Sequence, residues 1–137
     1  MSEFELRSIG RVESALTALD QAPRQPDEGA PGAELVFEDA MLEGLRNLRP
    51  GDDVIVVTWL DRARRDVLTV HPRGDLSRKP EGVFSTRSPH RPNPIGLHRT
   101  RIVAVDGCRI EVESLEALDG TPIVDVKPVL SGDVADR

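Results

Sequence analysis

The sequence predicts an all-β fold, a barrel or a strongly curled sheet of seven or eight short strands with one short helix and long loops. Three observations predict it. Short segments of alternating or continuous apolar residues recur along the 137 residues. Gly, Pro and Asp-Gly turns separate these segments. Aromatic residues are few (three Phe, one Trp and no Tyr), so the core of the single domain expected over residues 1–137 must be aliphatic.

The first part of the chain is expected to hold three strands and the helix. The expected strands are Glu5–Glu13, Ala33–Phe37 and Asp53–Leu60. The last of these is a continuous apolar run, which is typical of a strand buried on both faces. Asp39 is placed to N-cap a helix over residues 40–48, which carries four apolar residues on one face and ends before Pro50. Between the first two strands, Ala15–Gly32 reads as a long surface loop because it is rich in Pro, Gly and Asp.

The second part is expected to contain five more short strands. These are Asp66–Pro72, Val83–Thr86, Leu97–Val105, Cys108–Leu115 and Thr121–Leu130. Asp106-Gly107 and Asp119-Gly120 predict tight two-residue turns, since both residue types tolerate positive φ. The lone cysteine, Cys108, excludes an intrachain disulfide framework and is expected to be a small apolar residue.

One stretch, TRSPHRPNPIGL (Thr86–Leu97), combines three prolines with two arginines, a histidine and an asparagine. Proline fixes its own φ and keeps the preceding residue extended, so this loop is stiff. Other polar loops rich in Arg, Pro or Gly are PRQP (Pro23–Pro26), Asp61–Arg65, HPRGD (His71–Asp75) and DGTP (Asp119–Pro122). Guanidinium groups on pre-organised loops favour a pocket for an anionic or zwitterionic ligand.

The charge distribution supports the same interpretation. The formal net charge is −6, which argues against a general nucleic-acid binder. The segment Gly82–Val105 nevertheless contains four arginines and no acid, and it leaves −10 on the rest of the chain. This basic segment suits binding of an anionic partner. The alternative is that it forms a solvent-exposed basic face without a partner.

Several classes of protein are excluded or disfavoured. No apolar run is long enough to span a membrane and no signal peptide opens the chain, so a cytoplasmic protein without membrane contact is expected. The glycine-rich nucleotide motifs and the GxSxG nucleophile motif are missing. The three histidines, His71, His90 and His98, do not occur in metal-ligand spacing, so no metal is expected.

The motif GVFSTRSPHRPNPIGL, with PRQP and HPRGD before it and DGTPIVDVKP after it, resembles the TsaA/TrmO family of S-adenosylmethionine-dependent tRNA methyltransferases. The resemblance extends from about Leu6 to Leu130. It implies a single-sheet β-barrel of about seven strands that works as a homodimer. It also implies methyl transfer to N6 of N6-threonylcarbamoyladenosine, next to the anticodon of tRNA. Longer family members carry a C-terminal domain, which we expect to be absent from this chain.

The resemblance also implies which residues contact the cofactor, S-adenosylmethionine. They are Pro23, Arg24, Gln25, Asp61, Arg62, Arg87, Leu97, Asp119, Gly120, Thr121 and Pro122. Candidates for contact with the methyl acceptor are Arg91, Asn93, Arg99 and Arg101, the last two sharing one face of a strand with Leu97. His90 is the candidate general base within the central motif; its plain alternative is packing against a proline.

Three functions remain open from the sequence. The first is the tRNA methyltransferase of the family type. The second is a methyltransferase of the same barrel that acts on a small metabolite or another acceptor, since the acidic net charge and the expected absence of the C-terminal domain leave the substrate open. The third is a non-catalytic ligand-binding or RNA-binding module.

Overall fold

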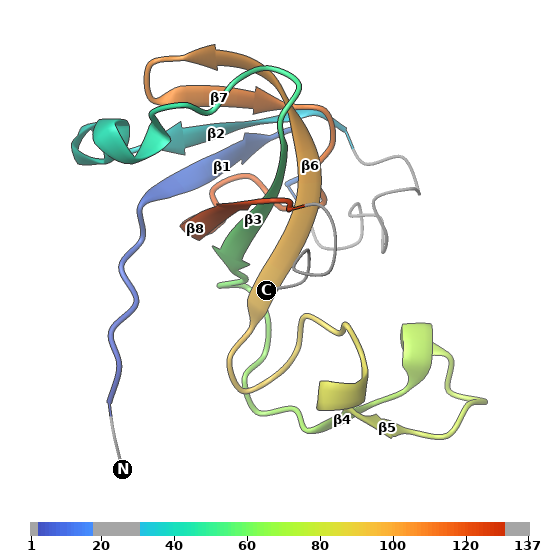
Figure 1. Cartoon of the computed structure of the whole chain (residues 1–137). Coiled ribbons are helices and arrows are strands. Elements are labelled where there is room, and N and C mark those ends of the chain that lie inside the picture. Colours follow the sequence, from blue (N-terminus) through green and yellow to red (C-terminus); the bar gives the residue numbers. More distant parts are fainter. Residues whose placement is uncertain (1–2, 18–30, 131–137) are drawn as a thin grey trace.

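Six antiparallel strands pair in a closed ring (Figure 1). They are β1 (Gly10–Ser14), β2 (Ala33–Phe37), β3 (Asp53–Trp59), β6 (Ile95–Asp106), β7 (Arg109–Val112) and β8 (Pro122–Pro128). Their order around the barrel is β1-β2-β7-β6-β3-β8, and β8 pairs back to β1. The structure is a computed structural model that describes residues 3–17 and 31–130. The all-β prediction is confirmed.

Side chains alternate between the barrel interior and the outer face. In β6 every second residue from Gly96 to Ile102 is buried, and in β3 Val54, Val56 and Thr58 are buried while their neighbours are half-buried. The expectation that β3 is buried on both faces is therefore wrong, because only one of its faces packs into the core. The hydrophobic core is aliphatic, as expected, apart from Phe37.

A 3-10 helix, η3 (Asp39–Leu45), covers one end of the barrel where the sequence predicts a helix over residues 40–48. Leu45 is buried, whereas Leu42 is exposed, because a three-residue period spreads the apolar residues over more than one face. Glu38, not Asp39, occupies the N-cap position, and it makes no side-chain capping bond.

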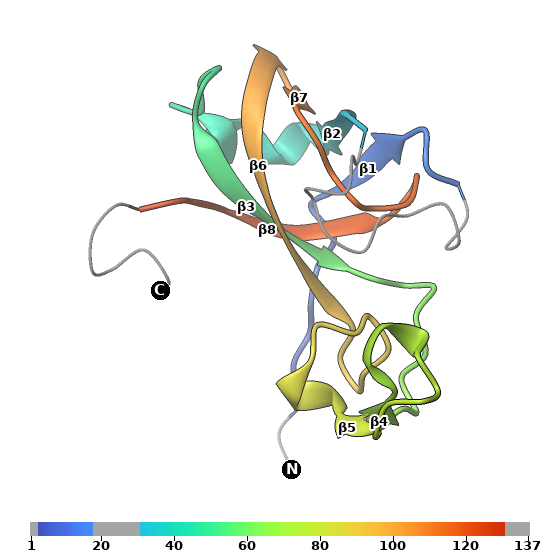
Figure 2. The same cartoon turned by 90° about the vertical axis from the view of Figure 1, so that its right-hand side faces the viewer.

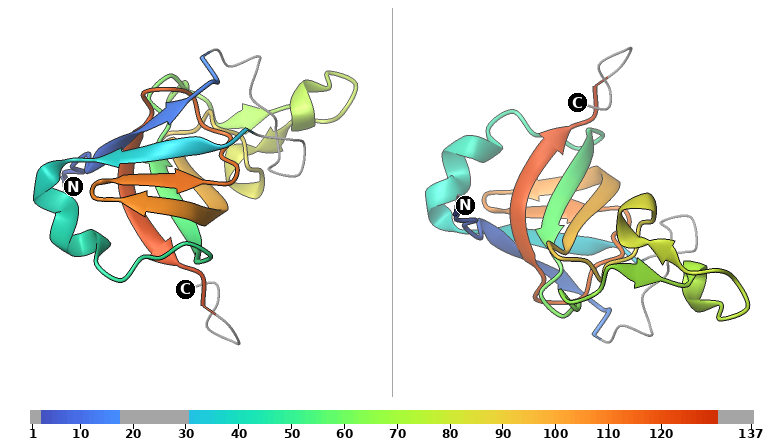
Figure 3. Two further views of the ribbon diagram at one scale, coloured as in Figure 1. Left: turned by 90° about the horizontal axis from the view of Figure 1, so that it is seen from above. Right: turned by 90° about the horizontal axis from the view of Figure 1, so that it is seen from below.

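The segment between β3 and β6, residues 60–94, forms a separate lobe beyond the barrel (Figures 1 and 2). It contains β4 (Thr69–Val70), η4 (Pro72–Gly74), β5 (Glu81–Gly82) and η5 (Val83–Ser85), with β4 and β5 paired. Both views of Figure 3 show the lobe to one side of the barrel strands. Because Trp59 and Ile95 are register partners, the lobe begins and ends beside a single rung of the sheet.

Four expected elements differ from the structure. The strand expected over Glu5–Glu13 begins only at Gly10, and the preceding residues extend away from the barrel (Figure 1). The strand expected over Asp66–Pro72 is reduced to β4, and the one over Val83–Thr86 is the 3-10 turn η5.

The fourth difference is the β6–β7 turn, which lies one residue later than expected, at Gly107–Cys108, with Gly107 at φ +60°. Glycine at the first central position of such a turn matches the strand twist. Cys108 is half-buried in this turn and packs against the core. No helix in the described part of the chain is long and apolar enough to cross a membrane.

Candidate functional site

The loops that carry the expected cofactor residues leave the same end of the barrel. Because the strands are antiparallel, the connections β1–β2, β3–β6 and β7–β8 share the end at which β1 and β3 finish and β6 and β8 begin. Three of the expected residues, Pro23, Arg24 and Gln25, belong to the β1–β2 connection but lie outside the described residues. The other expected cofactor residues lie in or beside the remaining two connections, and the structure describes them all.

Hydrogen bonds join these connections to one another. The Arg62 guanidinium donates to the carbonyl of Thr17 at 2.9 Å. The backbone N–H of Asp119 donates to the carbonyl of Leu16 at 2.7 Å, and the carboxylate of Asp119 accepts from the N–H of Ser14 at 3.0 Å. The segment that follows β1 is therefore held by the lobe on one side and by the DGTP turn on the other.

The DGTP turn itself is rigid. Gly120 has φ +86°, which favours glycine, and its N–H donates to the carbonyl of Val12. Thr121 is buried, and its hydroxyl donates to the carbonyl of Leu118 at 2.7 Å. Asp119 and Gly120 are exposed above it, so the turn presents a carboxylate and peptide groups at the end of the barrel. This confirms the predicted turn.

The arginines of the stiff loop have different roles. Arg91 is half-buried and points back into the lobe, where its guanidinium donates to the carbonyls of Val83 and Thr86, the latter at 2.8 Å. In this arrangement Arg91 shapes the loop rather than facing an acceptor. Arg87 is exposed, and no carboxylate of the described residues lies within ion-pair distance of it.

Arg65 fixes the lobe to the barrel. Its guanidinium lies 5.0 Å from the ring centre of Trp59, the last residue of β3. It also donates to the carbonyl of Pro92 at 2.7 Å and to the side-chain oxygen of Asn93 at 3.1 Å. One side chain thus bridges the two ends of the lobe, and the Asn93 side-chain oxygen, expected to face an acceptor, takes part in this bridge.

His90 also belongs to the internal structure of the lobe. Its Nδ1 accepts a hydrogen bond from the backbone N–H of Arg64 at 3.0 Å, and the Arg91 N–H donates to the carbonyl of Arg64. Since a backbone N–H can only donate, the neutral His90 ring carries its proton on Nε2. His90 therefore presents a donor at Nε2 and not the lone pair that a general base needs.

Leu97, Arg99 and Arg101 lie together on the exposed outer face of β6, as the strand parity predicts. Their surroundings are less basic than the sequence indicates, because the neighbouring strand β3 contributes an acid. Arg101 forms an ion pair with Asp53 at 3.1 Å, and Asp53 is its register partner. Leu97 is 55% exposed and lies opposite Val57.

A buried polar pair inside the barrel was not identified from the sequence. The His98 Nε2 lies 2.8 Å from the hydroxyl of Thr58, and both residues are buried. Gly96 makes room for them: a Cβ at this position would lie 2.5 Å from that hydroxyl and 2.7 Å from Nε2. Burial lowers the pKa of His98 to about 4, so the ring is neutral at neutral pH.

A groove of about 610 Å³ lies on the outer face of β1, β2 and β7 and reaches Ser14, Ala15 and Gly32, which flank the β1–β2 connection. Four glutamates line it: Glu13, Glu34, Glu111 and Glu113. Arg109 donates to two of them, Glu13 at 3.1 Å and Glu34 at 2.6 Å, and the Arg109 hydrogen bond lowers the pKa of Glu13. Its acidic lining disfavours an anionic ligand, so the loop end of the barrel remains the candidate site.

Comparisons with known proteins show what the chain is similar to. An S-adenosyl-L-methionine-binding protein of Archaeoglobus fulgidus is 41% identical over 122 residues, covering 89% of this chain and 86% of that protein. A second protein of that organism, named as a probable S-adenosyl-L-methionine-binding protein, is 42% identical over 131 residues. The match covers 96% of this chain but only 35% of the longer relative.

Solved structures are similar over the whole barrel. The crystal structure of TrmO from Pseudomonas aeruginosa matches with a TM-score of 0.75 and 28% identity, covering 99% of this chain and 61% of that one. The model of the tRNA-methyltransferase O N-terminal domain matches residues 11–133, which extend from the second residue of β1 to beyond β8 and include all three connections at the loop end. By this match the chain belongs to the family of tRNA-methyltransferase O N-terminal domains.

Proposed function

We propose that the protein is an S-adenosylmethionine-dependent methyltransferase that methylates tRNA at N6 of N6-threonylcarbamoyladenosine. One observation carries the proposal: Arg62, in the β3–β6 connection, and Asp119, in the β7–β8 connection, both form hydrogen bonds with residues at the end of β1 or just after it. These bonds hold two of the expected cofactor loops beside the start of the third, the β1–β2 connection. The family membership and the names of the relatives support the choice of cofactor.

The residues at this end of the barrel fit the cofactor chemically. Arg87 supplies an exposed guanidinium that suits the cofactor's carboxylate. Asp119 supplies an exposed carboxylate, and the DGTP turn supplies peptide groups, which suit a sulfonium and hydroxyl groups. When bound, S-adenosylmethionine supplies an electrophilic methyl group, so the protein's main task is to orient donor and acceptor.

The stiff loop contributes orientation rather than proton transfer. Arg91 bonds to the carbonyls of Val83 and Thr86 within the loop, and Arg65 ties the end of the loop to the start of the lobe, so the exposed Arg87 projects from a fixed backbone. His90 presents an Nε2–H donor, which suits a carbonyl oxygen of an acceptor. Among the described residues, none beside this loop stands out as a base. The proton of the acceptor nitrogen therefore leaves to solvent in this proposal.

A homodimer in the cytoplasm, with Arg99 and Arg101 as further contacts to the acceptor, completes the proposal. The second candidate function, methylation of a small metabolite, is favoured by the excess of acidic residues on the barrel and by the ion pair that neutralises Arg101. It uses the same cofactor site.

The test is methyl transfer from radiolabelled S-adenosylmethionine to two tRNA samples, one carrying the threonylcarbamoyl group and one lacking it. We expect transfer only to the modified sample. Calorimetry with the cofactor is run beside it. Cofactor binding without transfer to either tRNA would favour the small-metabolite function, and absence of cofactor binding would reject both.

A further inference from the structure

We infer that the lobe, residues 60–94, is an RNA-docking element in which the exposed ring of Phe84 stacks on a base while the cations of the lobe contact phosphates. The inference rests on the proposed function, since it assumes that the acceptor is RNA. It makes the lobe the main docking surface and leaves the arginines on β6 as further contacts.

Charge separates the lobe from the barrel. Residues 60–94 contain eight Lys or Arg and four Asp or Glu, a net charge of +4. The whole chain carries −6, so the remaining residues carry −10. A polyanion is therefore attracted to the lobe and repelled by most of the barrel.

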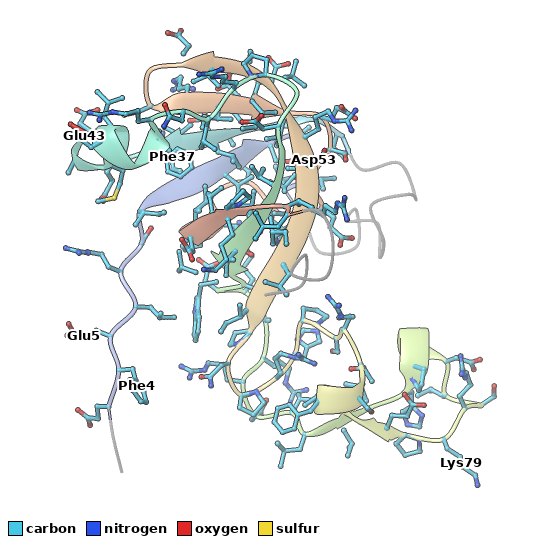
Figure 4. The ribbon with its side chains drawn as sticks, in the orientation of Figure 1. Phe4, Glu5, Phe37, Glu43, Asp53 and Lys79 are labelled. Atoms are coloured by element: carbon cyan, nitrogen blue, oxygen red, sulfur yellow. The ribbon has the colours of Figure 1, made fainter. Side chains whose placement is uncertain are left out.

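Part of that positive charge is available to a partner. Arg78 and Lys79 are exposed, and in the part of the chain that the structure describes no carboxylate lies within ion-pair distance of them. Figure 4 places Lys79 at the outer tip of the lobe and Asp53, the partner of Arg101, far from it on the barrel. The lobe thus offers two unpaired cations, whereas one of the two arginines on the outer face of β6, Arg101, is paired.

Large apolar side chains are exposed on the same lobe. Phe84 is 79% exposed, although its neighbour Val83 is completely buried beneath it. Leu68 and Leu76 are 64% and 80% exposed, and the Val83 N–H donates to the carbonyl of Leu68, so Leu68 and Phe84 lie on adjacent segments. An exposed ring and unpaired cations on one surface element are the combination with which proteins hold unpaired nucleotides, because every base has a face that stacks.

The lobe is built as a rigid unit despite having little regular structure. At its tip, Ser77 donates from its N–H and its hydroxyl to the Asp75 carboxylate, at 2.9 and 2.6 Å, which lowers the pKa of Asp75. The His71 Nδ1 donates to the carbonyl of Arg78 at 2.8 Å. These bonds fix the backbone that carries Arg78 and Lys79, so little ordering entropy is lost on binding.

The position of the lobe suits presentation of a nucleotide to the candidate site. The lobe leaves the barrel at the end where the three connections meet, and Arg65 bonded to Pro92 and stacked on Trp59 sets its direction. An RNA held on the lobe therefore lies beside that end of the barrel.

The test measures binding of a fluorescently labelled, unmodified tRNA transcript by anisotropy, with cofactor affinity and sedimentation measured on every variant. We expect Phe84→Leu to weaken RNA binding on the order of tenfold and Phe84→Trp to retain it, since only the ring stacks. The double variant Arg78→Glu, Lys79→Glu should weaken binding. It should also reduce the magnitude of the slope of log K against log salt concentration by roughly one to two.

Matched controls lie on η3, at the far end of the barrel. Leu42→Ala removes an apolar side chain that is 54% exposed, and Arg46→Glu reverses an exposed cation. We expect neither to change RNA affinity, and none of the variants to change cofactor affinity or folding.

Each remaining outcome overturns the inference. Lobe variants that bind RNA like the wild-type protein would show that the docking surface lies elsewhere, while the proposed function stands. A wild-type protein that binds no RNA would reject the proposed acceptor as well. Lobe variants that lose RNA binding only together with self-association would show that the lobe is a protein–protein surface.

Discussion

His98, whose side chain is buried inside the barrel, makes the stability of the folded protein depend on pH. The ring is 5% exposed, bonds Thr58 through Nε2, and finds no partner for Nδ1 among the described residues. Burial therefore favours the neutral ring and lowers its pKa from 6.5 to about 4. Protonating the ring requires placing an uncompensated charge inside the barrel.

The consequence for stability follows from the sign of this shift. Between pH 6.5 and pH 4 the unfolded chain binds a proton at His98 that the folded protein does not, so this contribution to stability is lost as the pH falls. From pH 7 to pH 5 the loss is about 2 kcal/mol. Denaturant titrations at both pH values should show a smaller pH dependence, by about that amount, in His98→Gln. An unchanged pH dependence in the variant would contradict the assignment.

Arg87 gives a second test at a single side chain. If its guanidinium forms a forked contact with the cofactor, Arg87→Lys should weaken cofactor binding nearly as much as Arg87→Ala, roughly tenfold or more, because an ammonium cannot make paired bonds. Calorimetry with S-adenosylmethionine measures this. Arg64→Lys serves as the control, since Arg64 pairs with Asp66 on the surface of the same lobe. A lysine variant with wild-type affinity would place the cofactor elsewhere.

At the scale of elements, the position of the lobe between β3 and β6 depends on the side chain of Arg65. Arg65 stacks on Trp59 and bonds to Pro92 and Asn93. Arg65→Ala should therefore loosen the lobe while the barrel remains folded, seen as faster proteolysis within residues 60–94 and a change in the fluorescence of the single Trp. Arg64→Ala should change neither. Equal proteolysis of the two variants would show that Arg65 does not fix the lobe.

Much of this arrangement could be predicted from the sequence. Local patterns correctly gave the bounds of β2, the outward face of Leu97, Arg99 and Arg101, and the Asp119-Gly120 turn. These features depend on strand parity and turn chemistry, which are local.

The sequence did not reveal partners that come from another strand. The Asp53–Arg101 ion pair, the Arg65–Trp59 contact and the His98–Thr58 pair each join residues six to 48 positions apart through the register of β3 and β6 or the path of the lobe. The strand predicted over Val83–Thr86 is wrong for a related reason. This segment begins with an apolar residue because the Val83 side chain is buried, and the segment itself forms a 3-10 turn.

The molecule as a whole is divided between an acidic barrel and a basic lobe. One lobe with a net charge of +4 makes few phosphate contacts, too few to hold tRNA firmly at physiological salt. A two-fold assembly would present two lobes. We therefore expect the protein to sediment as a homodimer at micromolar concentration, with tRNA affinity that falls steeply with salt. A monomeric mass together with salt-sensitive tRNA binding would show that one lobe suffices.

The register partners Trp59 and Ile95 close the 35 intervening residues onto one rung of the sheet. The lobe is therefore the loop of the hairpin formed by β3 and β6. The entropic cost of closing a loop grows slowly, by about 0.6 kcal/mol for each doubling of its length. We therefore expect mutations and insertions in the outer part of the lobe to leave the barrel's folding nearly untouched. If the lobe docks RNA as inferred, the preference for one acceptor over another can diversify there, while Asp61, Arg62 and Arg87, the expected cofactor residues of the same connection, are constrained by the cofactor.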